Sequence, residues 1–174
     1  MPATPATGSE PVQLDQLVCF ALYAASRAVI NGYRPLLDEV GLTYPQYLAL
    51  LVLWDRGPQP VKELGRALRL DSGTLSPLLK RLESAGLVRR ERRPGDERSV
   101  LVTLTDAGRE LERTARDIPV RAACMTDLPA DELADLLRSL VRFTSAITGD
   151  TTTSGATPHP ARPDTAEPNS QGAS

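Results

Sequence analysis

Apolar side chains recur every three or four residues in two short segments near the middle of the chain, which is the pattern of amphipathic helices. The first segment spans residues 60–70 and the second spans residues 71–86. Two short helices joined by a brief turn predict a helix-turn-helix. The core-facing positions are Val61, Leu64 and Leu68 in the first helix, and Leu75, Leu78, Leu79 and Leu82 in the second.

Apolar and polar residues alternate in the next stretch, residues 87–105, and this alternation predicts a β-hairpin. Val100, Val102 and Leu104 occupy alternate positions of its second strand, and residues 94–97 form the turn. A helix-turn-helix followed by such a wing is a winged helix, which usually binds duplex DNA. The predicted fold class is therefore mainly α with a small β-wing.

Helical periodicity also extends over both sides of this module. Pro35 is expected to break the first helix or to start a second short one, and Thr43 is a plausible cap. Thr105 or Asp106 is expected to cap the helix that follows the hairpin. The apolar faces are too extended for one central lobe to cover, so we expect a two-fold homodimer. These flanking helices are predicted over residues 14–40, 43–57, 106–125 and 129–147.

The two ends of the chain contain few large apolar residues and are expected to be disordered tails. The predicted organisation is a tail at 1–11, N-terminal dimerisation and sensor helices at 12–58, a winged helix-turn-helix lobe at 59–105, C-terminal dimerisation helices at 106–148, and a second tail at 149–174.

Charge is distributed unevenly along the chain. Residues 60–98 contain ten Lys and Arg against six Asp and Glu, a local charge of +4, whereas the remainder contains ten against sixteen, a local charge of −6. With a total of −2, the molecule is not a general polycation that would coat nucleic acid. The positive charge lies in the predicted winged helix, as expected if only that face approaches phosphates.

The second helix of the module is expected to enter the major groove. Ser72 or Asp71 can cap its start, with free backbone N–H groups near a phosphate, and Lys80 and Arg81 are expected to hold the DNA backbone. In the hairpin, Arg98 is expected to enter the minor groove with Asp96 beside it. A solvated basic hairpin is the alternative for the wing. The predicted DNA-contacting residues are Ser72, Thr74, Ser76, Pro77, Lys80, Arg81, Arg92, Arg93, Asp96 and Arg98.

Cys19 and Cys124 are the two cysteines. The chain shows no signal peptide and no apolar run that could span a bilayer, so we expect a cytoplasmic protein whose Cys–Cys bonds are transient and regulatory. Each cysteine could also be inert packing, since cysteine behaves as a small hydrophobe. The one histidine, His159, lies in the second tail, so we predict no histidine-based metal site and no cofactor.

Three segments, residues 17–54, 70–90 and 96–119, resemble the MarR-type winged-helix regulators. More narrowly, C-F-x-L-Y, Y-R-P-L-L and L-T-Y-P-Q-Y are similar to the organic hydroperoxide resistance repressors, known as OhrR. The resemblance covers roughly residues 12–148.

The resemblance implies that organic hydroperoxides oxidise Cys19, whose thiolate accepts hydrogen bonds from Tyr33 and Tyr44 of the other subunit. A phenolic O–H group stabilises a thiolate, and Phe20, Leu22 and Trp54 would give an apolar surround. It further implies that Cys124 resolves the oxidised sulfur as an intersubunit disulfide, which moves helices and releases DNA.

The sequence therefore favours a peroxide-sensing transcriptional repressor that binds an A·T-rich inverted repeat and is not an enzyme. Two alternatives stay open. One is a MarR-like regulator that binds a small phenolic ligand, with both cysteines inert. The other is a thiol peroxidase that acts through Cys19 and Cys124, although such an enzyme has no use for a basic winged helix.

Overall fold

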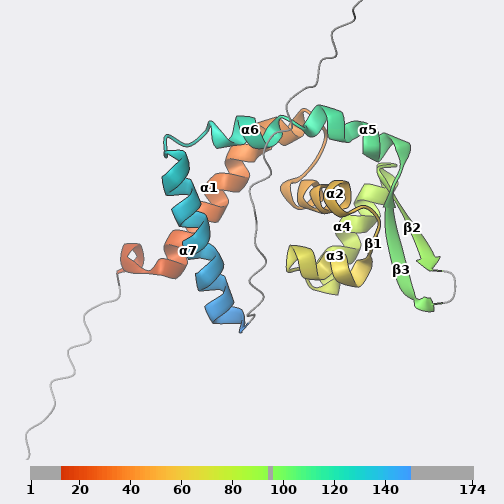
Figure 1. Ribbon diagram of the computed structural model, residues 1–174, viewed down its shortest axis with the longest axis horizontal. Coiled ribbons are helices and arrows are strands. Elements are labelled where there is room, and N and C mark those ends of the chain that lie inside the picture. The colour runs from red at the N-terminus through yellow and green to blue at the C-terminus, as the bar shows by residue number, and fades with distance from the viewer. Residues whose placement is uncertain (1–12, 94–95, 150–174) are drawn as a thin grey trace, which may run out of the picture. The chain divides into compact units, whose positions relative to one another are not determined.

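The computed structural model describes residues 13–93 and 96–149, apart from the side chains of residues 93–99. The chain forms two units, residues 1–127 and residues 128–174. The first contains the winged helix with its N-terminal and following helices, and the second contains one long helix (Figure 1). In chain order the elements are η1 (Leu14–Gln16), α1 (Val18–Asp38), α2 (Tyr44–Arg56), β1 (Gln59–Pro60), α3 (Val61–Leu68), α4 (Ser72–Ser84), β2 (Val88–Arg93), β3 (Asp96–Leu104), α5 (Asp106–Ala115), α6 (Ile118–Ala123) and α7 (Ala130–Thr148).

Helix α1 differs from the prediction at both ends. It begins at Val18 after a separate 3-10 turn, and it has no side-chain cap. It also continues through Pro35 as far as Asp38, so the predicted break is wrong. Proline removes only the hydrogen bond to the carbonyl four residues earlier, and near a helix end few further bonds depend on it. The result is one helix of 21 residues, long enough to separate chemical groups at its two ends.

Helices α2, α3 and α4 match the predicted pattern. Thr43 precedes α2. The Gln46 side-chain oxygen accepts hydrogen bonds from the Thr43 backbone N–H at 2.8 Å and from the Thr43 hydroxyl at 2.9 Å. Arg69 ends α3 in the left-handed conformation, with φ of 54°, and lets the chain turn sharply into α4. The predicted helix-turn-helix is confirmed.

The wing belongs to a three-stranded antiparallel sheet in the order β1-β3-β2. Strands β2 and β3 form the predicted hairpin, and Val88 pairs with Leu104 at its base. The short strand β1 was not predicted from the sequence. It holds Gln59 opposite Val102 and leads directly into α3, so the sheet is connected to the helix-turn-helix at two points.

The helix predicted over residues 106–125 is two helices in the structure. Helix α5 ends at Ala115 and α6 begins at Ile118. Pro119 is the second residue of α6, where its missing N–H is tolerated, whereas inside one continuous helix it would have lost a hydrogen bond to Ala115. The break gives the segment that carries Cys124 its own short helix.

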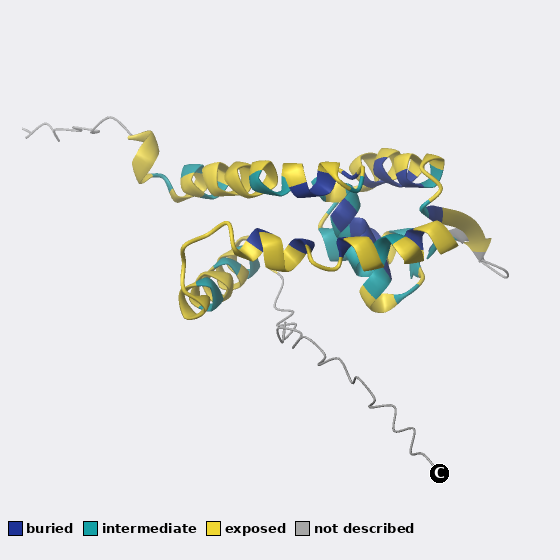
Figure 2. Ribbon diagram, turned by 90° about the horizontal axis from the view of Figure 1, so that it is seen from above, coloured by how far each residue is buried: buried dark blue, intermediate teal, exposed yellow. Residues whose placement is uncertain are grey.

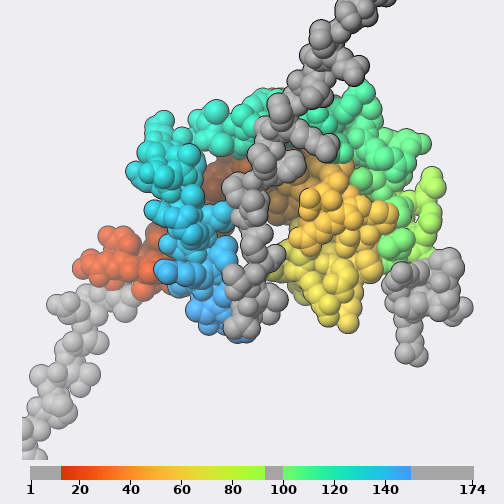
Figure 3. Space-filling model, viewed as in Figure 1, coloured from red at the N-terminus to blue at the C-terminus, as the bar shows by residue number. Residues whose placement is uncertain are grey.

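One apolar core joins the C-terminal end of α1 to the winged helix (Figure 2). Leu37, Leu50, Leu64, Leu79 and Leu82 are each at most 1% exposed. In the space-filling view, the orange, yellow and green side chains of α2, α3 and α5 lie packed together (Figure 3). Most of α1, in contrast, is exposed. Helix α7 contains no buried residue within its own unit.

Candidate DNA-binding face and thiol site

Helix α4 presents one apolar and one polar face, as the sequence predicts. Leu75, Leu78, Leu79 and Leu82 are buried in the core. The structure places all of the predicted groove-facing side chains of this helix on the exposed side. These are Ser72, Thr74, Ser76, Pro77, Lys80 and Arg81.

Asp71 caps α4, which decides between the two predicted caps. Its carboxylate accepts hydrogen bonds from the backbone N–H of Thr74 at 3.0 Å and from the Thr74 hydroxyl at 2.9 Å. These bonds hold the pKa of the Asp71 carboxyl below its ordinary value. The Thr74 hydroxyl proton is therefore committed to the cap, although its oxygen can still accept a hydrogen bond.

An ion pair connects the wing to the end of α4. The Glu83 carboxylate accepts from Arg90 Nε at 2.8 Å, from Arg90 Nη2 at 2.6 Å and from the Arg90 backbone N–H at 3.1 Å. The guanidinium holds the pKa of the Glu83 carboxyl below its usual value. Arg90 thus orients β2 against the recognition helix, a structural role that the sequence did not reveal.

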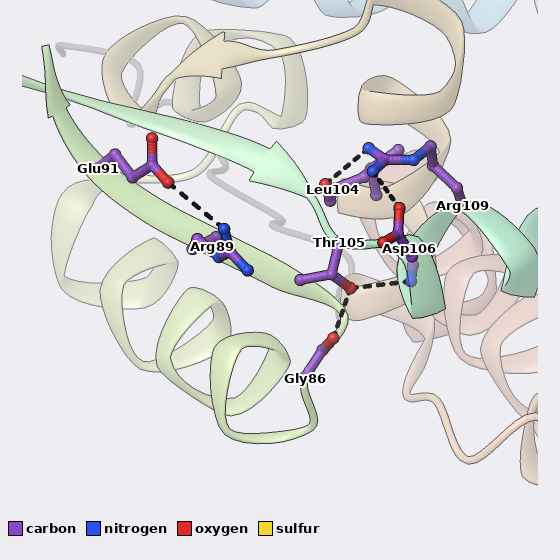
Figure 4. A network of polar contacts seen from close by, with 8 residues as sticks. Gly86, Arg89, Glu91, Leu104, Thr105, Asp106 and Arg109 are labelled. Carbon is purple, nitrogen blue, oxygen red and sulfur yellow. Dashed lines mark hydrogen bonds and ion pairs between the residues drawn. The ribbon is translucent and has the colours of Figure 1, made fainter.

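The base of the wing is fastened by the start of α5 (Figure 4). The Thr105 hydroxyl donates to the Gly86 carbonyl at 2.5 Å and accepts from the Gly108 N–H at 3.1 Å, which confirms Thr105 as the cap. Arg109 donates to the Leu104 carbonyl at 2.9 Å and to Asp106 at 2.6 Å. This network fixes the angle between the hairpin and α5.

The exposed part of the wing carries the remaining predicted DNA contacts. Arg92 is exposed on β2. Arg89 lies 3.9 Å from Glu91, an ion pair between exposed side chains that contributes little energy. The side chains of Arg93, Asp96 and Arg98 lie outside the described residues, so their predicted roles stay predictions.

Cys19 is exposed and is the second residue of α1. Leu17 occupies the cap position of this helix, and Asp15 belongs to the preceding 3-10 turn. Cys19 consequently lies within the first turn, where the partial positive charge of a helix start is concentrated.

Tyr33 and Tyr44 lie side by side at the opposite end of α1. Their ring centroids are 5.0 Å apart in an edge-to-face arrangement, and both side chains are half-buried. Burial raises the pKa of both phenols, so they are neutral O–H donors at neutral pH. The structure thus brings together the two tyrosines that the family resemblance assigns to the thiolate.

Tyr47 extends this cluster into the core. Its ring centroid lies 6.3 Å from that of Tyr33 and 6.2 Å from that of Trp54, and the residue is 2% exposed. Its hydroxyl is the one buried side-chain polar atom without a hydrogen-bond partner among the described residues. Burial, and then the charges of Tyr33, Tyr44 and Asp117, raise the pKa of Tyr47 to about 12. Such an unsatisfied group costs about 1–3 kcal/mol.

Trp54, which was expected near Cys19, is held within its own subunit by a hydrogen bond and a ring contact. Its indole N–H donates to the Gly108 carbonyl at 2.9 Å, and its ring packs against Tyr47. Within one subunit it therefore belongs to the contact between α2 and α5 and is not part of the surroundings of Cys19.

Cys124 is exposed directly after α6, and this helix packs on the C-terminal half of α1. A Cβ atom on Gly32 would lie 3.1 Å from Met125 Sδ, so the residue after Cys124 covers Gly32 closely. Arg121 donates to both carboxylate oxygens of Glu39, at 2.7 and 2.8 Å. These contacts hold Cys124 at the same end of α1 as the tyrosine pair.

The two cysteines of one chain are far apart. Thirteen residues of α1 separate Cys19 from Gly32, which corresponds to about 20 Å along the helix axis. Fourteen residues separate Cys19 from Tyr33, or about 21 Å. A disulfide requires Cα atoms within about 7 Å of each other. In this conformation neither the tyrosine pair nor Cys124 can reach Cys19 of its own subunit.

None of the described helices is both long and apolar enough to cross a membrane. No cluster of three or more His, Cys, Asp or Glu side chains in the same residues is arranged to bind a metal ion.

The helix-turn-helix with its paired wing defines a winged-helix DNA-binding protein, and comparison with known proteins identifies its class. Residues 42–100 match the model of the MarR family. The organic hydroperoxide resistance transcriptional regulator of Bacillus subtilis (strain 168) is 46% identical over 129 residues, which cover 74% of this chain and 88% of that protein. The chain belongs to the MarR family of transcriptional regulators.

Two further relatives agree with this assignment. The HTH-type transcriptional regulator TtmR of Methylorubrum extorquens (strain PA1) is 51% identical over 131 residues, covering 75% of this chain and 67% of that protein. Reduced AbfR bound to DNA is 38% identical, with a TM-score of 0.67, and the match covers 78% of this chain and 94% of that one. A structure of disulfide-formed AbfR is 34% identical, with a TM-score of 0.57 and coverage of 79% and 93%.

Proposed function

We propose that this protein is a dimeric repressor that releases its operator DNA when an organic hydroperoxide oxidises Cys19. The observation that carries the proposal is the placement of the thiol and the phenols at opposite ends of α1. Cys19 is about 21 Å from Tyr33 of its own chain, so only a second copy of the chain can bring the two together. A two-fold arrangement of α1 helices would form two such sites.

Exposed apolar side chains support this dimer. Val18, Val29 and Ile30 on α1 are 40–61% exposed, and Val120 on α6 is 67% exposed. Considered by itself, α7 also leaves Leu136, Leu137, Val141 and Ile147 exposed. Apolar surface of this extent on helices outside the core is typical of a buried interface between subunits.

The proposed chemistry begins at the thiolate of Cys19, with Tyr33 and Tyr44 of the partner donating hydrogen bonds to it. The sulfur attacks the outer oxygen of the hydroperoxide, the O–O bond breaks, and the organic alcohol leaves after taking up a proton. Cys19 is then a sulfenic acid. The thiolate of Cys124 of the partner attacks this sulfur, forming the S–S bond and releasing water.

The position of Cys124 supports its role in the second step. It lies at the same end of α1 as Tyr33, so a Cys19 that reaches the tyrosines of a partner also comes near Cys124 of that partner. The structures of AbfR, one reduced and bound to DNA and one with a disulfide, agree with such a cycle. The disulfide would pull on α6, which is joined through α5 to the base of the wing, and so change the spacing of the two DNA-binding faces.

Operator binding before and after oxidation tests the proposal. The reduced protein is expected to bind an A·T-rich inverted repeat and to release it on addition of cumene hydroperoxide. Cys19→Ser, which changes one exposed atom, should bind equally well and stay bound after the peroxide. Release of the Cys19→Ser protein by peroxide would refute the sensing role. Release of the untreated protein by a phenolic compound alone would instead favour a regulator that senses a small ligand.

A further inference from the structure

The hydroxyl of Tyr47 has no structural use within a single subunit. It is buried and unpartnered, and phenylalanine would fill the same space without burying a polar atom. Its ring neighbours include Tyr33, and Tyr33 in turn packs against Tyr44. The ring that carries the unused O–H group therefore lies beside Tyr33. Tyr33 is one of the two phenols of the proposed sensing site, which consists of Cys19 of one subunit with Tyr33 and Tyr44 of the other.

We propose that Tyr47 is a positioning residue of this site, and that its hydroxyl donates a hydrogen bond to the Tyr33 oxygen while Tyr33 donates to the thiolate of the partner. The inference rests on the proposed function, because it needs the thiolate to be held by Tyr33. In the isolated subunit no bond joins the two hydroxyls, so the bond would form when the thiolate draws the Tyr33 O–H into place.

The chain of hydrogen bonds from Tyr47 through Tyr33 would stabilise the thiolate. A phenol that accepts a hydrogen bond is polarised and becomes a stronger donor, and the effect is larger inside a protein than in water. The thiolate is the charged end of this chain, where hydrogen bonds are strongest. The ionisable groups facing Tyr47 are Tyr33 on α1, Tyr44 on α2 and Asp117 between α5 and α6. Tyr47 acts through Tyr33 and does not itself touch the sulfur.

The test removes one oxygen atom and follows the reactivity of a single thiol. All variants carry Cys124→Ser, so that Cys19 is the one thiol of the chain. The rate of alkylation by monobromobimane is measured against pH for the parent, Tyr47→Phe, Tyr33→Phe and the double variant. Tyr47→Phe should shift the midpoint of the profile upward and slow alkylation below the midpoint by roughly two- to fivefold. The plateau at high pH should not change, because access to the sulfur is unaltered.

The midpoints of the four proteins separate the possibilities. Tyr33→Phe should shift the midpoint further than Tyr47→Phe, and adding Tyr47→Phe to it should have no further effect. An unchanged midpoint in Tyr47→Phe alone would overturn the inference and leave the proposed function intact, whereas unchanged midpoints in both single variants would also overturn the proposed hydrogen bond from Tyr33 to the thiolate. A shift of equal size with and without Tyr33 would also overturn the inference, because Tyr47 would then not act through Tyr33.

Stability and DNA binding provide the control for a merely structural role. Circular dichroism should show that Tyr47→Phe melts at the same temperature as the parent or higher, since an unsatisfied buried hydroxyl has been removed. Operator affinity of the reduced protein should not change. A lower melting temperature together with a changed plateau would assign the hydroxyl to packing and contradict the proposal.

Discussion

The proposed disulfide can be tested by assigning its two sulfurs to different subunits. In one chain, Cys19 and the end of α1 that carries Cys124 are about 20 Å apart, against about 7 Å for the Cα atoms of a disulfide. Closing that gap within a subunit requires a movement of about 13 Å. Such a movement would break the Arg121–Glu39 ion pair and the contact of Met125 with Gly32. A disulfide between subunits requires no such movement within either chain.

The experiment uses a heterodimer in which each subunit lacks one of the two cysteines. Cys19→Ser and Cys124→Ser chains are co-expressed with different affinity tags and purified through both tags. After oxidation by cumene hydroperoxide, the heterodimer should run as a covalent dimer on a non-reducing gel, because one Cys19 and one Cys124 still face each other across the interface. Homodimers of either variant provide matched controls and should not form this bond.

The result that would refute the reasoning is equally clear. If the wild-type disulfide forms within one chain, the heterodimer cannot form it, since neither subunit contains both sulfurs. A wild-type protein that loses both free thiols while the oxidised heterodimer stays non-covalent would therefore contradict the intersubunit bond. A covalent band in the Cys124→Ser homodimer would show that two Cys19 residues pair instead, and would remove Cys124 from the mechanism.

Two further predictions concern the base of the wing. Gly108→Ala should lower the free energy of unfolding by about 1–3 kcal/mol in a denaturant titration, because the added Cβ would collide with the Leu87 carbonyl oxygen; an unchanged midpoint would contradict this contact. Glu83→Gln should lower the melting temperature above about pH 5, and the difference from wild type should shrink as the pH falls towards about 3. The sign follows because the pKa of Glu83 is lowered by Arg90, so its stabilisation is present at higher pH and is lost on protonation; a difference that does not vary with pH would refute it.

Much of the DNA-binding module could be predicted from local pattern. The leucines of α4 recur at helical spacing, so the sequence alone assigned Ser76, Lys80 and Arg81 to the exposed face, and the structure places them there. The hairpin was predicted from the alternation of apolar and polar residues. The predictions were wrong at two prolines, because α1 continues through Pro35 and a new helix begins beside Pro119. Whether a proline interrupts a helix depends on how many backbone hydrogen bonds of that helix follow the proline.

The sequence by itself determined the winged helix, the polar face of α4 and, through its resemblance to a family, the residues of the candidate thiol site. Only the tertiary structure decided that Arg90 forms an ion pair with Glu83, that the Trp54 indole donates a hydrogen bond to the Gly108 carbonyl, and that Tyr47 buries a hydroxyl without a partner. The reason is that periodicity reports which face of an element is covered, whereas a hydrogen bond between distant segments depends on how those elements pack. The same packing separates Cys19 from Tyr33 along α1, and the proposed requirement for a second subunit follows from that separation.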